Sequence, residues 1–219
     1  DLKDFQIKSV IGRGSFGKVF LVQKVSDKAV YAMKSLRKDV ILDYDQIEST
    51  LLEKDILLKA DHPFLVGMEY VFQTDQKIFF VMKFVRGGEL FMHLRKSRQF
   101  NEERTKFYSL TVALALGHLH KQKIIYRDLK PENLLLSEDG RVRITDLGLA
   151  TRVTSRLHGA AGTRGYWAPE MLKRNDAGKR MNYDHRIDWF SFGCVLAEMI
   201  SGVNPFRSEA ALKFGQEKE

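Results

Sequence analysis

The sequence predicts an α+β fold in which a small, mainly antiparallel β-lobe precedes a mainly helical lobe. Short runs with strand-like alternation dominate as far as Phe84, and after Gly87-Gly88 the pattern changes to long segments with helical periodicity. The 219 residues, 44% hydrophobic and 29% charged, are enough to bury a core in one domain or two small lobes. We therefore expect lobes at 1–82 and 89–219, joined by a hinge at 83–88.

The first lobe is expected to consist of strands interrupted by one helix. Ile7–Ile11 and Val19–Val22 flank a glycine-rich turn, and strands over Val30–Leu36 and Ile78–Phe84 follow. The helix is predicted over Gln46–Lys59 because apolar residues recur there at helical spacing. The members of this stripe are Leu51, Leu52, Ile56, Leu57 and Leu58.

The second lobe is expected to contain helices over Leu90–Lys96, Glu102–Leu119 and Asp188–Ser201. The loops between them hold most of the unusual residues. The last helix carries Cys194, the one cysteine of the chain, which cannot form an internal disulfide. We interpret it as a buried core thiol, so redox chemistry is not the expected function.

Charge and hydropathy exclude several classes of function. The net charge is +8 with pI ≈ 9.5, but the basic residues are scattered, with only short clusters such as Arg95-Lys96-Ser97-Arg98. We interpret them as a solvated surface, and expect no nucleic-acid partner. No apolar run approaches the roughly 20 residues of a membrane span, and no signal peptide opens the chain. We expect a cytoplasmic protein without a transmembrane segment, and any recruitment to membranes through regions outside this chain.

A glycine-rich turn and a lysine–glutamate pair indicate phosphate binding. The run 12–19, Gly-Arg-Gly-Ser-Phe-Gly-Lys-Val, fits G-x-G-x-x-G-x-V, whose missing side chains let backbone N–H groups approach phosphate oxygens. Lys34 lies on the next strand but one, and Glu53 follows 19 residues later in the predicted helix. Such a pair would hold the ammonium against the α- and β-phosphates. Taken by themselves, these residues are more often hairpin glycines that only permit positive φ and two unrelated surface charges.

The second lobe contains three further motifs. The run 126–133, Tyr-Arg-Asp-Leu-Lys-Pro-Glu-Asn, supplies a carboxylate, a lysine two residues on and an amide five residues on. Asp146-Leu147-Gly148 begins 13 residues after Asn133, and Ala168-Pro169-Glu170 follows. Five motifs in this order and at these spacings are not explained by chance.

Over its whole length the chain resembles the catalytic domain of protein kinases. The resemblance implies transfer of the γ-phosphate of ATP to protein Ser/Thr hydroxyls in intracellular signalling, with Mg²⁺, or Mn²⁺ in its place. It implies that Asp128 accepts or orients the hydroxyl proton, that Lys130 steadies the transferring phosphoryl group, and that Lys34 and Glu53 complete the catalytic set. The implied metal ligands are Asn133 and Asp146, whose oxygens suit a hard cation.

The resemblance also implies where the nucleotide binds. Adenine is expected beside Met82, with backbone groups of Lys83 and Val85 as hydrogen-bond partners. The implied nucleotide contacts are Gly12, Gly14, Ser15, Phe16, Gly17, Val19, Ala32, Lys34, Met82, Lys83, Val85, Glu89, Glu132 and Leu135. Asp188 resembles an aspartate that braces the catalytic loop, and we expect it to be the N-cap of its helix as well.

Shorter motifs resemble one branch of the family. Lys130 and Gly162-Thr163 are typical of Ser/Thr rather than Tyr kinases. Tyr126 in place of the commoner His, with the segments 62–66 and 87–91, resembles the AGC group. Within that group, the segments 146–150, 162–170 and 188–194 are most similar to G-protein-coupled receptor kinases. A receptor or a regulatory domain is therefore an expected partner.

Two glutamates bear on substrate choice. Glu89 and Glu132 occupy positions at which basophilic AGC kinases bind arginines upstream of the phosphorylated residue. We expect substrates with arginine two or three positions before the Ser/Thr. The alternative is that Glu89 mainly binds the ATP ribose and Glu132 is merely solvated.

The chain departs from the family pattern at three points. Leu147 replaces the usual Phe, which keeps an apolar side chain and should be tolerated. Gly159 stands where many AGC kinases carry an activating phosphothreonine, so Arg127 is expected to lack its usual partner. The chain begins at Asp1 and only Gly202–Glu219 follow the last predicted helix, so we expect a fragment of a catalytic domain, which need not be active by itself.

Two other classes of function stay open as alternatives. A pseudokinase could act as a nucleotide-gated scaffold, although the complete set of catalytic residues argues against it. A nucleic-acid-binding module would explain the positive charge, but clustered aromatic residues are missing from the basic segments.

Overall fold

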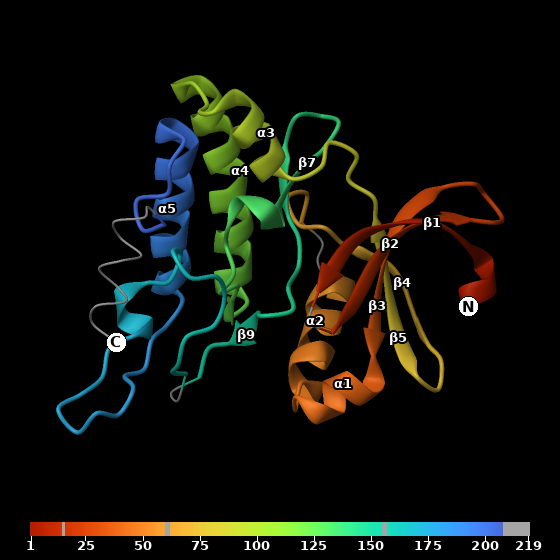
Figure 1. The fold of residues 1–219 in the computed structure, drawn as a ribbon, viewed down its shortest axis with the longest axis horizontal. Coiled ribbons are helices and arrows are strands. Elements are labelled where there is room, and N and C mark those ends of the chain that lie inside the picture. The colour runs from red at the N-terminus through yellow and green to blue at the C-terminus, as the bar shows by residue number, and fades with distance from the viewer. Residues whose placement is uncertain (15, 60–61, 155–156, 208–219) are drawn as a thin grey trace. The chain divides into compact units, whose positions relative to one another are not determined.

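The structure is a computed structural model that describes residues 1–14, 16–59, 62–154 and 157–207 (Figure 1). The chain divides into two compact units, 1–86 and 87–219, and each is described by itself. The division falls inside the segment 83–88 that we expected to be a hinge. Among the described residues, no helix combines the length and the apolarity that crossing a membrane requires.

The first unit is built on a five-stranded antiparallel sheet with the order β1-β2-β3-β5-β4. The short helix η1 (Leu2–Asp4) precedes it. The strands are β1 (Phe5–Gly14), β2 (Gly17–Lys24), β3 (Val30–Arg37), β4 (Met68–Gln73) and β5 (Lys77–Lys83). Four of them confirm the expected strands, and β4 was missed although its side chains alternate between half-buried and exposed.

Apolar side chains fill one face of this sheet. The buried members are Phe5, Val22, Met33, Phe79 and Val81, packed against Phe20, Tyr31, Tyr70 and Phe72. The rings of Phe5 and Phe72 stack with centroids 5.9 Å apart. Because successive side chains of a strand point to opposite faces, the burial of Met33 in this core places its neighbour Lys34 on the other face.

Two helices, rather than the single one expected, accompany the sheet. They are α1 (Lys38–Asp43), which contacts β3, and α2 (Ile47–Lys59), which contacts β4. The expected apolar stripe of α2 was partly wrong, because Leu51 and Leu58 are each 51% exposed. The buried face runs through Glu53, Ile56 and Leu57, a spacing of three and four residues that includes a carboxylate.

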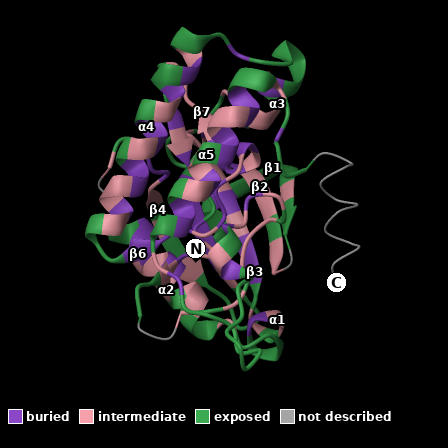
Figure 2. Cartoon of the chain, turned by 90° about the vertical axis from the view of Figure 1, so that its left-hand side faces the viewer, coloured by how far each residue is buried: buried purple, intermediate pink, exposed green. Residues whose placement is uncertain are grey.

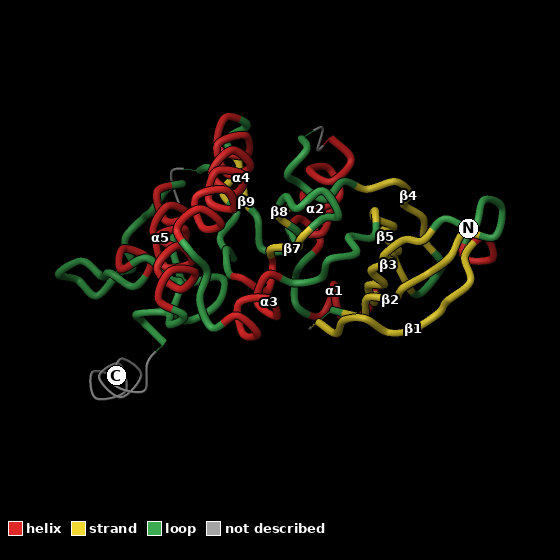
Figure 3. Tube along the Cα trace, turned by 90° about the horizontal axis from the view of Figure 1, so that it is seen from above, coloured by secondary structure: helices red, strands yellow, loops and turns green. Residues whose placement is uncertain are grey.

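The second unit is mainly helical, and Figure 3 shows its helices as red coils. It contains α3 (Leu90–Ser97), α4 (Glu102–Lys121) and α5 (Arg186–Ser201), which confirm the three expected helices. Helix α4 begins where the side chain of Asn101 accepts a hydrogen bond from Arg104 N, and α5 ends at Gly202 with φ 78°. Helices α4 and α5 contact each other, and buried positions recur along both (Figure 2).

Short elements fill the loops of the second unit. The two-stranded sheets pair β6 (Ile124–Ile125) with β9 (Thr151–Arg152), and β7 (Leu134–Leu136) with β8 (Val142–Ile144). Two 3₁₀ turns, η2 (Pro131–Asn133) and η3 (Pro169–Met171), lie in the predicted motifs. These short elements carry the functional loops.

Helix α5 tests two expectations. Cys194 is buried, as predicted, and burial raises the pKa of its thiol to about 11. The expectation that Asp188 is the N-cap was wrong, because His185 takes that position and Asp188 lies inside the first turn. Its carboxylate is directed to another segment, described below.

Candidate active site

Lys34 and Glu53 form a largely buried ion pair in the first unit. Lys34 Nζ lies 2.6 Å from Glu53 Oε1, and the side chains are 18% and 4% exposed. The lysine comes from β3 and the glutamate from the buried face of α2. The structure thus brings the two residues together, whereas their role toward a nucleotide stays a prediction.

The glycine-rich turn connects β1 and β2, with Gly14 paired to Gly17. A Cβ atom at Gly17 would lie 1.7 Å from the carbonyl oxygen of Ser35, so close packing against β3 requires glycine there. At Gly14 the same atom would meet nothing within 4 Å, which leaves its backbone accessible. Phe16 accepts a backbone hydrogen bond from Arg37. Ser15, a predicted nucleotide contact, lies outside the described residues.

The other predicted nucleotide contacts are distributed over both units. In the first unit, Ala32 is directly opposite Met82 across β3 and β5, and Val19 is opposite Lys34 across β2 and β3. Lys83 also forms an ion pair with Glu69 at 3.3 Å. Gly12 lies on β1, and Val85 is buried just beyond β5. In the second unit, Glu89 and Leu135 form an isolated β-bridge.

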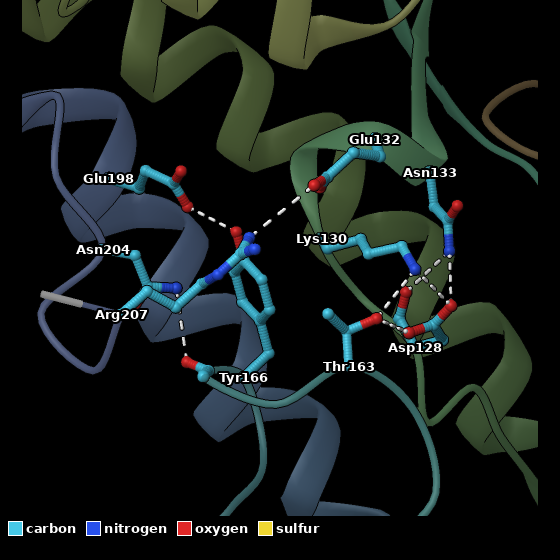
Figure 4. A network of polar contacts seen from close by, with 10 residues as sticks. Asp128, Lys130, Glu132, Asn133, Thr163, Tyr166, Glu198, Asn204 and Arg207 are labelled. Carbon is cyan, nitrogen blue, oxygen red and sulfur yellow. Dashed lines mark hydrogen bonds and ion pairs between the residues drawn. The ribbon is translucent and has the colours of Figure 1, made fainter. Parts of the chain in front are cut away.

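The catalytic-loop carboxylate of Asp128 is held by three side chains, shown at the right of Figure 4. Thr163 Oγ1 donates to Oδ1 at 2.7 Å, and Asn133 Nδ2 donates to Oδ2 at 2.9 Å. Lys130 Nζ lies 2.9 Å from Oδ2 and also donates to Thr163 Oγ1 at 2.7 Å. The structure therefore brings the predicted residues Asp128, Lys130 and Asn133 together. Thr163 was noted only as a family marker, and its contacts were missed.

The predicted metal ligands Asn133 and Asp146 lie on either side of the β7–β8 hairpin. Asn133 immediately precedes β7, and Thr145 alone separates the end of β8 from Asp146. The backbone N–H of Thr145 donates to Asn133 O at 3.0 Å. The side-chain nitrogen Nδ2 of Asn133 donates to Asp128. The side-chain oxygen of Asn133 is therefore directed away from Asp128. Among the described residues no group of three His, Cys, Asp or Glu could hold a metal by itself. One carboxylate with one amide oxygen fits Mg²⁺, which commonly takes few protein ligands and completes its shell with phosphate oxygens and water.

Asp188 braces the catalytic loop, as expected. Its carboxylate is fully buried and accepts from the backbone N–H groups of Tyr126 at 2.9 Å and Arg127 at 2.8 Å. His120 Nε2 lies 2.7 Å from the same carboxylate. Arg127, which we expected to lack its usual phosphothreonine partner, donates through Nε to the carbonyl oxygen of Leu149 at 2.7 Å. This bond ties the catalytic loop to the segment that follows Asp146.

In the segment from Asp146 to Glu170, glycines such as Gly159 and Gly162 have positive φ angles that other residues rarely adopt. Leu147 is buried, so its apolar side chain is accommodated as expected. Gly159 has φ 88° and supplies no hydroxyl group. Gly162 has φ 98°, and a Cβ atom there would lie 2.2 Å from the carbonyl oxygen of Arg127. Glycine at 162 is thus what allows Thr163 to approach Asp128.

A second polar cluster, the Glu132 cluster, consists of Glu132, Tyr166, Glu198, Asn204 and Arg207 (left and centre of Figure 4). Tyr166 OH donates to Glu198 Oε2 at 2.6 Å, and Arg207 Nη1 lies 3.7 Å from Glu132 Oε1. Burial raises the pKa of Glu198, and the charge of Glu132 raises it further. Glu198 and Arg207 were not predicted, because neither belongs to a recognised motif.

Comparison with known proteins agrees with the motifs. A family profile described as protein kinase domain matches residues 5–218. The chain is 45% identical to a RAC family serine/threonine-protein kinase homolog of Dictyostelium discoideum, over 94% of this chain and 46% of that protein. It is 45% identical to mouse serine/threonine-protein kinase Sgk3, over 93% of this chain and 40% of that protein. It is also 44% identical to the cAMP-dependent protein kinase catalytic subunit of D. discoideum, over 94% of this chain and 31% of that protein.

These relatives are AGC-type Ser/Thr kinases, and they do not support the receptor-kinase branch specifically. The chain spans less than half the length of each of them. With the profile matching nearly all of the sequence, the chain belongs to the protein kinase domain family.

Proposed function

We propose that the protein containing this chain is a Ser/Thr protein kinase that transfers the γ-phosphate of ATP to hydroxyl groups of protein substrates. The observation that carries the proposal is the Asp128 carboxylate, which Thr163, Asn133 and Lys130 hold at 2.7 to 2.9 Å. A carboxylate with fixed orientation can accept or orient the proton of an attacking hydroxyl. The names of the relatives support the same reaction.

Each remaining site residue has a role in this proposal. Lys130 can stabilise negative charge on the transferring group, because its ammonium is already positioned beside Asp128. The ammonium of Lys34, kept in place by Glu53, binds the nucleotide phosphates. Asn133 and Asp146 would hold Mg²⁺, which supplies charge that neutralises the phosphates. The remaining predicted contacts, among them Gly12, Val85 and Leu135, bind the nucleotide.

The proposal is tested with the full-length protein, a generic Ser/Thr peptide and radiolabelled ATP. We expect transfer to require Mg²⁺ or Mn²⁺, and Lys34→Met to reduce it roughly 10²-fold or more. Lys8→Met is the matched control, because Lys8 is an exposed lysine on β1 whose ammonium donates a hydrogen bond to Gln6. Wild-type turnover in Lys34→Met would contradict the assignment. Nucleotide binding without transfer in the wild-type protein would favour the scaffold alternative.

Narrower proposals concern branch, location and control. The receptor-kinase branch rests on the motifs at 146–150, 162–170 and 188–194, and a regulator-of-G-protein-signalling-like domain in the full-length sequence would support it. We place the protein in the cytoplasm, with membrane recruitment left to other regions.

Control by a receptor, a regulatory domain or a tail would act on the Lys34–Glu53 pair. A pocket of about 170 Å³ beside α2 supports such control. It is lined by Lys38, Ile41, Leu42, Ile47, Thr50, Leu51 and Ile78.

The proposed substrates carry Ser or Thr, and the narrower class has arginine two or three positions upstream. Glu89 and Glu132 support this class, because a carboxylate can bind a guanidinium through two charge-assisted hydrogen bonds. Burial raises the pKa of Glu89, the charge of Glu132 raises it further, and Lys130 opposes both effects. The two carboxylates are therefore electrostatically coupled.

A further inference from the structure

Arg207 lies in a turn that is tied to the segment before Ala168. Within the turn, Phe206 N donates to Asn204 Oδ1 at 2.8 Å, and Arg207 N donates to Asn204 O at 3.2 Å. Asn204 Nδ2 in turn donates to the carbonyl oxygen of Gly165 at 3.3 Å. The backbone of the turn is thus positioned by hydrogen bonds that do not involve the guanidinium group.

The side chain of Arg207 fits over a glycine. A Cβ atom at Gly165 would lie 2.1 Å from Cγ and 2.7 Å from Cδ of Arg207, so any other residue at 165 would have to displace the arginine stem. The guanidinium carbon then lies 5.7 Å from the centroid of the Tyr166 ring. Aromatic contact of this kind favours a cation at this position.

The head of Arg207 reaches toward carboxylates. Its Nη1 lies 3.7 Å from Glu132 Oε1, while the Tyr166 hydroxyl donates to Glu198 (Figure 4). The charge of Arg207 lowers the pKa of Glu198, against the effect of burial and of Glu132. One arginine from the chain itself therefore compensates part of the charge of two glutamates.

The ion pair between Arg207 and Glu132 is long and partly exposed. A separation of 3.7 Å is an ion pair and not a hydrogen bond, and the two side chains are 42% and 28% exposed. Glu132 Oε2 is buried and has no hydrogen-bond partner among the described residues. The carboxylate thus retains hydrogen-bonding capacity, and a partly exposed ion pair of this kind is weak.

We propose that Arg207 is a specificity-determining residue: it occupies, from within the chain, the acidic position formed by Glu132 and Glu198, and so weakens selection for arginine upstream of the phosphorylated Ser/Thr. The proposal rests on the proposed kinase function. A substrate guanidinium that approaches Glu132 meets the repulsion of Arg207 and has to displace it. The wild-type protein should therefore prefer substrates with this arginine less strongly than the acidic residues Glu132 and Glu198 would allow if Arg207 were absent.

The test uses the full-length protein and pairs of serine peptides that differ only by Arg or Ala, two positions upstream in one pair and three in the other. The quantity measured is the ratio of kcat/KM for the Arg peptide to that for the Ala peptide within each variant, so a uniform change of activity cancels. We expect Arg207→Ala to raise this ratio roughly five- to tenfold, the scale of one charge-assisted contact. Arg207→Lys, which keeps the charge, should raise it much less. Arg180→Ala, at an exposed arginine outside the cluster, should leave the ratio at the wild-type value.

Peptide binding, measured by fluorescence anisotropy, separates this proposal from the kinase activity. Tighter binding of the Arg peptide by Arg207→Ala than by wild type supports the proposal even if no variant transfers phosphate, an outcome that would overturn only the proposed function. Adding Glu132→Ala to Arg207→Ala should abolish the gain. Equal ratios and equal binding in wild type and Arg207→Ala would overturn the role of Arg207.

Discussion

Asp128 and Glu132 belong to one loop, yet the chain holds their carboxylates in different ways. The Asp128 side chain is 8% exposed and its oxygens have partners at 2.7 to 2.9 Å. The Glu132 side chain is 28% exposed, with an ion pair at 3.7 Å and one oxygen without a hydrogen-bond partner among the described residues. The difference indicates that the group proposed to take part in the chemistry is fixed, whereas the group proposed to recognise the substrate can exchange partners.

The largest expected effect is at the fixed carboxylate. We expect Asp128→Asn to reduce kcat of the full-length protein roughly 10²-fold or more, because an amide cannot accept the hydroxyl proton. Glu132→Ala should instead reduce the Arg/Ala peptide ratio while the KM for ATP changes little. Steady-state kinetics with both peptides measures the two effects. Near-wild-type turnover in Asp128→Asn would show that the fixed group is not the catalytic one.

A second prediction concerns Asp188, which supports the loop that carries Asp128. Asp188→Ala removes the acceptor of two backbone N–H groups at Tyr126 and Arg127, and should lower the free energy of unfolding by about 2–4 kcal/mol. Asp184→Ala is the matched control, because its carboxylate accepts from the exposed Arg186, and we expect a loss below about 1 kcal/mol. Urea unfolding of the full-length protein measures both. Equal losses would mean that Asp188 is no more important than a surface carboxylate.

A third prediction tests whether Thr163 orients Asp128. Thr163→Val removes the hydroxyl that donates to Asp128 Oδ1 and accepts from Lys130, at similar volume. We expect kcat to fall roughly tenfold, as for the loss of one positioning hydrogen bond. Thr163→Ser keeps the hydroxyl and should restore most of the rate, which a purely steric role of the methyl group would not explain. Unchanged kcat in Thr163→Val would remove Thr163 from the site.

The sequence predicted the residues whose order and spacing are typical of the family, and missed contacts that no such spacing encodes. The Lys34–Glu53 pair and the Asp128 loop were predictable because their spacing is typical of the family. Thr163 and Arg207 reach their partners only through the tertiary fold, so local patterns did not reveal their contacts. Helix periodicity was similarly limited, since it located α2 but placed Leu51 on the buried face, where Glu53 lies instead.

The smallest expected effect concerns the segment around Gly159. Phosphorylation of this segment normally adds charge that an arginine of the catalytic loop can bind. Here Gly159, with φ 88°, has no hydroxyl, and Arg127 Nε already donates to Leu149 O at 2.7 Å. We therefore expect Thr154→Ala and Ser155→Ala to leave kcat within about twofold of wild type, because Arg127 does not need a phosphate group in this segment as its partner. Thr154, which is exposed, and Ser155, which lies outside the described residues, carry hydroxyl groups close to Gly159 in the sequence and are the alternative phosphate acceptors. Mass spectrometry of the active full-length protein, combined with the kinetics of both variants, makes the measurement. Stoichiometric phosphate on either residue, with activity lost in the corresponding alanine variant, would show that kinase activity depends on phosphorylation of this segment.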